Sequence, residues 1–244
     1  MKKLTTSRSL LVLLAIAIVS VVPLNFLFTR QSNEYAAAIL LQQKGAIIVN
    51  RWLGPRLFQE IGLEFPRFLR VTQVDFDGNQ FDDQDIRQCA VFLQLDSLGI
   101  ASDRVGANGI SGLEQLQHLS NLVLHGGKVN KQMIVAIKCL NHLRELGIDH
   151  AEITDDALDS LESLPNLSEL YLSNMNLSTV NLESLSRCHT VRLVDFKNST
   201  LPSNIVQFLR TMRSLESINV YGTNLSDSDI NTLRAEFPKL EFER

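Results

Sequence analysis

Cysteine is scarce in this sequence of 244 residues, and the three cysteines lie far apart. Cys89, Cys139 and Cys188 are separated by intervals of about 50 residues, whereas the ligands of a structural metal site have clustered spacing. An odd number also leaves at least one thiol without a disulfide partner. We therefore expect the three side chains to be small buried apolar groups rather than metal ligands.

The motifs of common enzyme chemistries are also missing. The sequence contains no nucleophilic triad signature, no P-loop and no dinucleotide fingerprint, and its 12 glycines are scattered. Paired acids such as Asp75 and Asp77, or Asp155 and Asp156, are explained by a solvated face or a helix N-terminus. We therefore expect no catalytic residues and no cofactor.

Charge is absent from one long stretch near the N-terminus. Residues 10–28 carry no charged side chain, and Lys2, Lys3 and Arg8 precede them. A run of this length can cross a bilayer as a helix, and the basic excess before it favours a cytoplasmic N-terminus. We predict that residues 1–32 form a cytoplasmic stub and an uncleaved transmembrane signal anchor, with the rest of the chain extracytoplasmic.

A cleaved signal peptide, which would yield a secreted protein, is the alternative interpretation of this segment. The apolar core of a signal peptide usually runs only about 7–15 residues. The small residues Ala36–Ala38 resemble a cleavage site, but they lie well beyond the apolar run.

Basic residues are scarce in the remainder of the chain. Without the four in residues 1–32, it has 19 basic and 27 acidic side chains, a net charge of −8. This balance argues against nucleic acid and anionic lipid surfaces as partners.

Apolar residues, by contrast, return at every 24th position. One column runs from Val74 to Ile218, and the columns that begin at Val71 and Phe76 are apolar throughout as well. No insertion or deletion breaks the register from residue 71 onward. A fixed period between about 20 and 50 residues is typical of solenoids, whose repeats bury a continuous core by stacking. The sequence therefore predicts a solenoid of seven repeats.

Each repeat combines a short strand with a helix. In residues 143–164, Leu146 and Ile148 alternate as in a strand with one buried face, and Ile153 turns inward after it. Apolar residues then follow at spacings of three and four, which predicts an amphipathic helix of about three turns. The expected helix starts are marked by Thr154 with Asp155, by Asp82 with Asp85, and by Ser226 with Asp229, the last pair at capping-box spacing.

The strand and turn of these repeats resemble those of a known family. Residues 143–154 read LRELGIDHAEIT and residues 167–177 read LSELYLSNMNL, and both are similar to leucine-rich repeats. The resemblance covers residues 69–242. It implies an α/β, right-handed leucine-rich repeat solenoid with a parallel concave sheet and a helical convex side, as in ribonuclease-inhibitor-like members. Residues 69–244 are the predicted repeat domain.

One feature of the family is incomplete here. The Asn that usually follows the strand occurs only as Asn79 and Asn198, with Asn174 nearby, so we expect no continuous ladder of buried Asn side chains. The glycines at equivalent places suggest tight turns instead, and these are Gly78, Gly126 and Gly222.

Residues 33–68 are the predicted N-terminal cap. We expect a helix over Glu34–Lys44, a strand over Ala46–Val49 and a second helix over Trp52–Ile61, with Trp52 and Phe58 covering the first repeat. The sequences KGAIIV and RWLG in this segment resemble those of membrane-anchored leucine-rich repeat proteins of bacteria.

Strand alternation identifies the side chains of the open concave face. Neighbouring strands of a sheet lie about 4.8 Å apart, so equivalent residues of adjacent repeats lie side by side. Aromatic side chains among acids on such a face are suited to anchor a protein partner, and a solvated face with incidental aromatics is the alternative. The predicted partner-binding residues are Tyr171, Leu193, Asp195, Tyr221, Glu145, Glu169 and Asp149.

Five histidines raise the question of a metal ion. His125, Asp149 and His150 fall on adjacent repeats near the strand ends, where three ligands can reach one ion. The sequence has no H-x-x-x-H pair and no cysteine nearby, however, so we expect no metal site. The other three histidines are expected on the surface, and these are His118, His142 and His189.

These features predict a membrane-tethered, non-catalytic module that binds a protein or peptide partner through the concave sheet. A substrate-recognition adaptor of a ubiquitin-ligase-like complex is one alternative, although residues 33–68 are short for a recruiting box. A metal-dependent enzyme and a structural envelope protein are the others.

Overall fold

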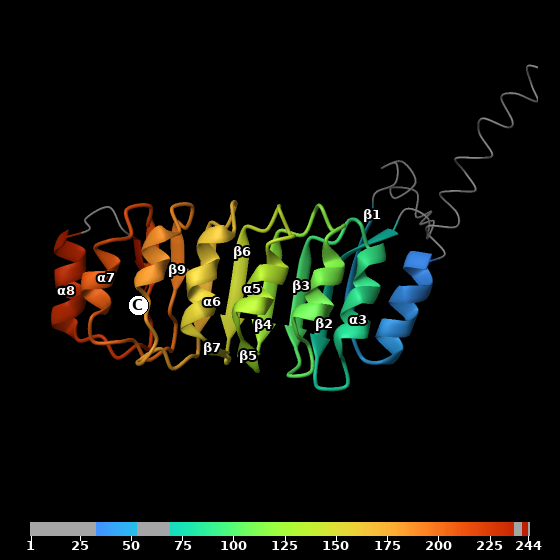
Figure 1. Ribbon diagram of the computed structural model, residues 1–244, viewed down its shortest axis with the longest axis horizontal. Coiled ribbons are helices and arrows are strands. Elements are labelled where there is room, and N and C mark those ends of the chain that lie inside the picture. The colour runs from blue at the N-terminus through green and yellow to red at the C-terminus, as the bar shows by residue number, and fades with distance from the viewer. Residues whose placement is uncertain (1–32, 53–68, 237–240, 244) are drawn as a thin grey trace, which may run out of the picture.

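The computed structural model describes residues 33–52, 69–236 and 241–243. In this part of the chain a single row of strands is lined on one face by helices, and the elements follow one another in space in chain order (Figure 1). The main sheet contains β1 (Ile47–Trp52), β2 (Leu69–Asp77), β3 (Ser97–Ala101), β4 (Asn121–His125), β6 (Glu145–Asp149), β8 (Glu169–Ser173), β9 (Leu193–Asp195), β10 (Ser217–Asn219) and β11 (Glu241–Glu243). A small second sheet pairs β5 (Lys128–Val129) with β7 (Glu152–Ile153).

From β2 to β11 the strands are parallel, and paired residues are 24 positions apart. Leu122 pairs with Leu98 on one side and with Leu146 on the other. The same offset holds from Gln73 with Ser97 near one end to Asn219 with Glu243 at the other. The 24-residue period predicted from the sequence therefore equals the offset between hydrogen-bonded residues of neighbouring strands.

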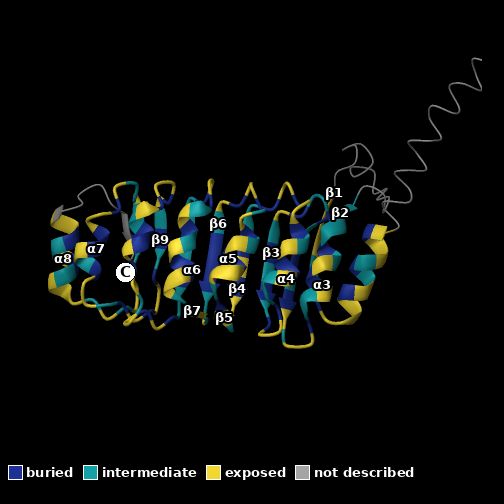
Figure 2. Ribbon diagram, viewed as in Figure 1, coloured by how far each residue is buried: buried dark blue, intermediate teal, exposed yellow. Residues whose placement is uncertain are grey.

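Buried and accessible residues alternate along most strands, and Figure 2 shows the burial of each described residue on the ribbon. In β4, Leu122 and Leu124 are buried, whereas Val123 and His125 are exposed. The predicted columns form one continuous apolar cluster along the solenoid. Seven equivalent residues have no accessible surface at all: Val74, Leu98, Leu122, Leu146, Leu170, Val194 and Ile218.

The repeat helices are shorter than the predicted three turns, except α8 (Asp227–Glu236) with its ten residues. The fourth repeat has six α-helical residues in α6 (Asp155–Ser160), which end in a 3₁₀ turn over Leu161–Ser163, and the fifth repeat has only a 3₁₀ helix over Glu183–Arg187. A 24-residue repeat must also hold a strand and two connections, which leaves little chain for a longer helix. The other α-helices are α3 (Asp83–Gln88), α4 (Ala107–Ile110), α5 (Lys131–Ile137), α7 (Ile205–Leu209) and α8 (Asp227–Glu236).

Two of the three predicted helix starts have the expected caps. The side chain of Asp82 accepts from the backbone of α3 while Asp85 accepts from the Asp82 N–H, which completes a capping box. Ser226 and Asp229 exchange equivalent bonds of 3.0 and 3.2 Å at α8. The third helix also starts where predicted, with Thr154 at the N-cap position and Asp155 in the first turn, but the Thr154 side chain makes no cap bond and its hydroxyl donates to Asp156 instead.

One position after the strand requires a left-handed backbone in almost every repeat. The predicted turn glycines Gly78, Gly126 and Gly222 have φ values of 110°, 76° and 70°. At the equivalent positions His150, Asn174 and Asn198 have φ values of 51°, 55° and 56°. Glycine adopts this conformation freely and Asn tolerates it, so the turn geometry restricts which side chains can follow each strand.

The N-terminal segment differs from the predicted cap. Residues 33–43 are helical and β1 follows, as expected, but β1 runs antiparallel to β2 and extends to Trp52. The helix predicted to begin at Trp52 is therefore wrong at that residue, and the remainder of it, with Phe58, lies outside the described residues. Glu34 ties this segment to the repeats by accepting from the Val71 N–H at 3.1 Å.

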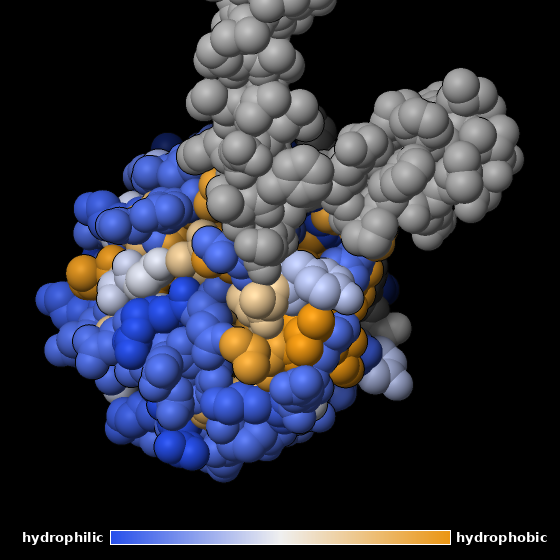
Figure 3. All heavy atoms as spheres, turned by 90° about the vertical axis from the view of Figure 1, so that its right-hand side faces the viewer, coloured by the Kyte–Doolittle hydropathy of each residue, from blue (hydrophilic) through white to orange (hydrophobic). Residues whose placement is uncertain are grey.

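Apolar side chains are exposed at the N-terminal end of the solenoid, on the face seen in Figure 3. Leu40, Ile47 and Val49 are 56%, 59% and 44% exposed. Within the described residues no helix is both long and apolar enough to span a bilayer. The predicted anchor over residues 10–28 lies outside that part of the chain.

The cysteines follow the predicted burial in two of three cases. Cys89 and Cys188 are buried, and burial raises the pKa of the Cys188 thiol to about 11. Cys139 is only half-buried, so the expectation of full burial is wrong there. None of the three forms a disulfide.

The buried columns should dominate the free energy of unfolding. We expect Leu146→Ala to lower it by about 3 kcal/mol, because the truncation leaves a cavity at a fully buried strand position. Val123→Ala, on the accessible face of the adjacent strand, should cost less than about 1 kcal/mol. Urea unfolding followed by circular dichroism measures both values, and equal losses would contradict the assignment of the two faces.

The cap of α3 should make stability depend on pH. The backbone N–H of Gln84, with a further contribution from that of Asp85, holds the pKa of Asp82 below its ordinary value. A carboxyl group with a depressed pKa stabilises the folded state at pH values above its pKa in the unfolded chain, about 3.9. This stabilisation is lost as the pH falls through the pKa in the folded state. We expect Asp82→Ala to lower the melting temperature at pH 7, with the difference from wild type shrinking below about pH 4.

The matched control is Asp82→Asn, which keeps a hydrogen-bond acceptor at the cap but does not titrate. Its melting temperature should stay close to that of the wild type at pH 7. A destabilisation by Asp82→Ala that is the same at pH 3 and pH 7 would show that the charged cap does not act as described.

Candidate functional site

The sheet register brings most of the predicted partner-binding residues together. Glu145 pairs with Glu169, Glu169 with Leu193, and Tyr171 with Asp195, so these side chains occupy three adjacent strands. They alternate with buried leucines and valines and are all half-buried on the accessible face. This group of five is called the concave strip below.

Acidic and phenolic groups are coupled within the concave strip. The Tyr171 hydroxyl donates to the Glu169 carboxylate at 2.8 Å. Partial burial raises the pKa of Tyr171, and the hydrogen bond and charge of Glu169 raise it further. Burial also raises the pKa of Glu145, with the neighbouring charges of Glu169 and Asp96 acting in the same direction. The carboxylates give the strip a negative charge, which a cationic group of a partner could neutralise.

Asp195 is held by the chain itself. Its carboxylate accepts from the Ser173 hydroxyl at 3.1 Å, from the Asn219 amide at 2.9 Å and from the Lys197 N–H at 2.7 Å. A carboxylate with this many donors is fixed in orientation. Asp195 therefore has a structural role in the strip, because most of its acceptor capacity is already used by groups of the chain itself.

Tyr221 lies farther along the solenoid than the rest of the predicted site. It follows β10, so β9 separates it from Tyr171 on β8. Its side chain is 52% exposed, and the Lys197 ammonium lies 6.0 Å from the ring centroid, at the limit of a cation–π contact. Tyr171 and Tyr221 mark two ends of one accessible surface rather than one compact patch.

Beside the strip, a hollow of about 1010 Å³ opens at the edge where the strands begin. Glu169, Leu193 and Ser217 line it from the strands, and Arg144 and Arg192 line it from the residues that lead into β6 and β9. The arginines were not predicted. The signal was available in the sequence, because both occupy the position just before the concave columns in their repeats.

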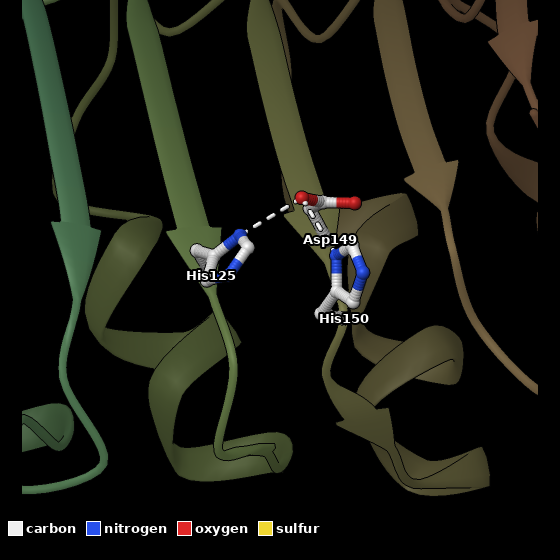
Figure 4. Close-up of side chains that lie close together, drawn as sticks. All are labelled: His125, Asp149 and His150. Atoms are coloured by element: carbon white, nitrogen blue, oxygen red, sulfur yellow. Dashed lines mark hydrogen bonds and ion pairs between the residues drawn. The ribbon is translucent and has the colours of Figure 1, made fainter.

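Asp149, the last predicted site residue, belongs to a different cluster at the other end of the strands. Figure 4 shows His125 and His150 both directed at its carboxylate, with His125 at the end of β4 and His150 directly after β6. The Nδ1 atoms of His125 and His150 lie 2.8 and 3.1 Å from Asp149 Oδ2. The cluster faces solvent, because His125 and His150 are both about half exposed. The other three histidines are exposed, as predicted, and lie elsewhere.

The asparagines of the turn column continue this cluster across the next repeats. Asn174 donates to Asp149 Oδ1 at 2.6 Å, and Asn198 donates to Asn174 at 3.1 Å. Partial burial disfavours the charged form of Asp149, but the bonds from Asn174, His150 and His125 outweigh it and lower its pKa. The sequence predicts no continuous ladder of buried Asn side chains. In the described residues, a partly exposed chain of amide, carboxylate and imidazole groups runs beside these turns.

Two solved structures illustrate a remote likeness to known proteins. No model of a protein family matches this sequence, and no curated protein does. The crystal structure of an internalin from Listeria monocytogenes is 20% identical, with a TM-score of 0.48, over 76% of this chain and 53% of that one. A leucine-rich repeat protein from Leptospira interrogans is 15% identical, with a TM-score of 0.38, over 65% and 57%.

The chain thus spans little more than half the length of either neighbour. The assignment of the fold rests on the geometry of the chain itself. Parallel strands are offset by 24 residues, their buried positions are leucine-like, and the helices between successive strands lie on one side of the sheet. These features identify the described part of the chain as a leucine-rich repeat fold of the α/β class.

Proposed function

We propose that this protein is a membrane-tethered, non-catalytic interaction module that binds a protein partner through the accessible face of its sheet. In this proposal residues 10–28 anchor a right-handed solenoid of seven repeats, which stands outside the cytoplasm. The observation that carries it is the contrast between the two faces of the strands. The buried columns are uniform, whereas the concave strip brings Tyr171, Leu193 and three carboxylates together in one place.

The chemistry of the strip indicates the kind of partner. The hollow beside the strip is open to solvent, which suits an extended surface contact more than a small substrate. Tyrosine supplies a large contact area at low entropic cost, and Tyr221 is accessible for this purpose. The carboxylates favour basic side chains on the partner, which would make association faster at low salt.

The apolar surface at the N-terminal end supports the tethering part of the proposal. Leu40, Ile47 and Val49 lie at the end of the solenoid to which the predicted anchor would connect. An apolar surface is stable next to a bilayer, whereas it is unfavourable in free solution.

Tethering predicts that the full-length chain stays with the membrane pellet after extraction at high pH, which removes peripheral proteins. The repeats should also resist a protease added from the cytoplasmic side. Release into the supernatant would favour the secreted alternative, and digestion from the cytoplasmic side would contradict the orientation.

Partner binding predicts that a photo-crosslinking residue placed at Tyr221 forms a discrete adduct with another protein in the membranes where the chain resides. The matched control is Val135 on α5, which is similarly exposed, at 54%, but lies on the helical side. We expect no equivalent adduct from Val135, because the proposed contact uses the sheet face alone.

The double variant Tyr171→Ala, Tyr221→Ala should then weaken binding of the identified partner at least about tenfold, as expected for buried aromatic anchors. Titration of the purified full-length chain with that partner measures the change. Equal affinity of the double variant and the wild type would remove the concave strip from the binding surface and favour a structural envelope role.

A further inference from the structure

The cluster of His125, Asp149 and His150 has the donor set of a metal site. Its three candidate ligand atoms all lie within 4.8 Å of one another. A zinc ion holds imidazole nitrogen and carboxylate oxygen at about 2.0–2.2 Å, which in a tetrahedron places neighbouring ligands roughly 3.4 Å apart. Two of the pairs already lie at 2.8 and 3.1 Å, so a small outward adjustment would admit an ion.

The surroundings of the cluster suit a cation. Asn174 donates to Asp149 Oδ1, whereas both imidazoles contact Oδ2, and this bond orients the carboxylate. Outer hydrogen bonds of this kind position the ligands of many metal sites. The nearby ammonium of Lys128 is paired with Glu152 at 2.8 Å, so its charge is compensated.

His150 occupies a left-handed backbone position that five of the other six repeats fill with glycine or asparagine. Its φ of 51° is uncommon for a residue other than glycine, and such conformations cluster at functional sites. In this turn the left-handed backbone places the imidazole beside Asp149, in contact distance of the ring of His125, with ring centroids 5.0 Å apart.

We propose that His125, Asp149 and His150 bind one divalent transition-metal ion of the zinc class, with the fourth coordination position open to solvent. Two imidazoles and one carboxylate favour zinc over calcium or magnesium, which prefer all-oxygen sites. Because both histidines are about half exposed, an ion can enter without unfolding the turn. The site lies at the opposite ends of the strands from the hollow and does not depend on a protein partner.

Calorimetric titration of the full-length chain with zinc chloride tests this proposal. The protein is purified in detergent without a polyhistidine tag and stripped of metal beforehand. We expect saturation at one zinc per chain, with no competition from equal concentrations of calcium or magnesium. Cobalt bound in place of zinc should give visible absorption bands that zinc abolishes.

Three variants assign the ligands. His125→Ala, Asp149→Asn and His150→Asn should each weaken zinc binding at least about tenfold, because each removes one of three protein ligands. Asparagine is chosen at position 150 because Asn174 and Asn198 adopt the same left-handed backbone, so the turn should be preserved. Circular dichroism and melting temperature verify that each variant is folded.

His118→Ala is the matched control, because His118 is exposed and lies apart from the cluster. It should bind zinc as the wild type does. The proposal is overturned if zinc shows no saturable binding, or if folded His125→Ala and His150→Asn variants retain the wild-type affinity. A loss in His118→Ala as large as that in His125→Ala would also overturn it.

Discussion

Parallel hydrogen bonding between strands exactly one repeat apart is the constraint on which this structure depends. Leu98, Leu122 and Leu146 are equivalent in sequence, and the sheet places them on adjacent strands. A single repeat cannot bury such a residue, because its apolar face is covered only by its neighbours. The constant offset thus converts a periodic sequence into one continuous apolar core.

The same register also places equivalent polar side chains of adjacent repeats next to one another. It places Glu145 beside Glu169 on the accessible face, where partial burial and the charge of Glu169 raise the pKa of Glu145. It also aligns the left-handed turns, so that Asn174 reaches the carboxylate of Asp149 in the preceding repeat. Both candidate sites arise in this way, from side chains that are one repeat apart in sequence and adjacent in space.

Much of this could be predicted from the sequence, because each prediction depended on local pattern and a fixed period. The buried columns, the turn glycines and the caps at Asp82 and Ser226 are examples. The antiparallel pairing of β1 was not predictable in this way, because it lies outside the repeat. The short helices were missed because helical spacing of apolar residues does not distinguish an α-helix from a helix that ends in a 3₁₀ turn.

The sequence alone determined the solenoid, its period and the residues of its buried and accessible columns, since stacking at a constant offset follows from the pattern itself. Only the tertiary structure decided how side chains within those columns meet. It joined the Tyr171 hydroxyl to the Glu169 carboxylate, and it directed two histidines at the carboxylate of Asp149. The physical reason is that a repeat specifies which residues are neighbours, whereas backbone conformation at the turns specifies where their side chains point.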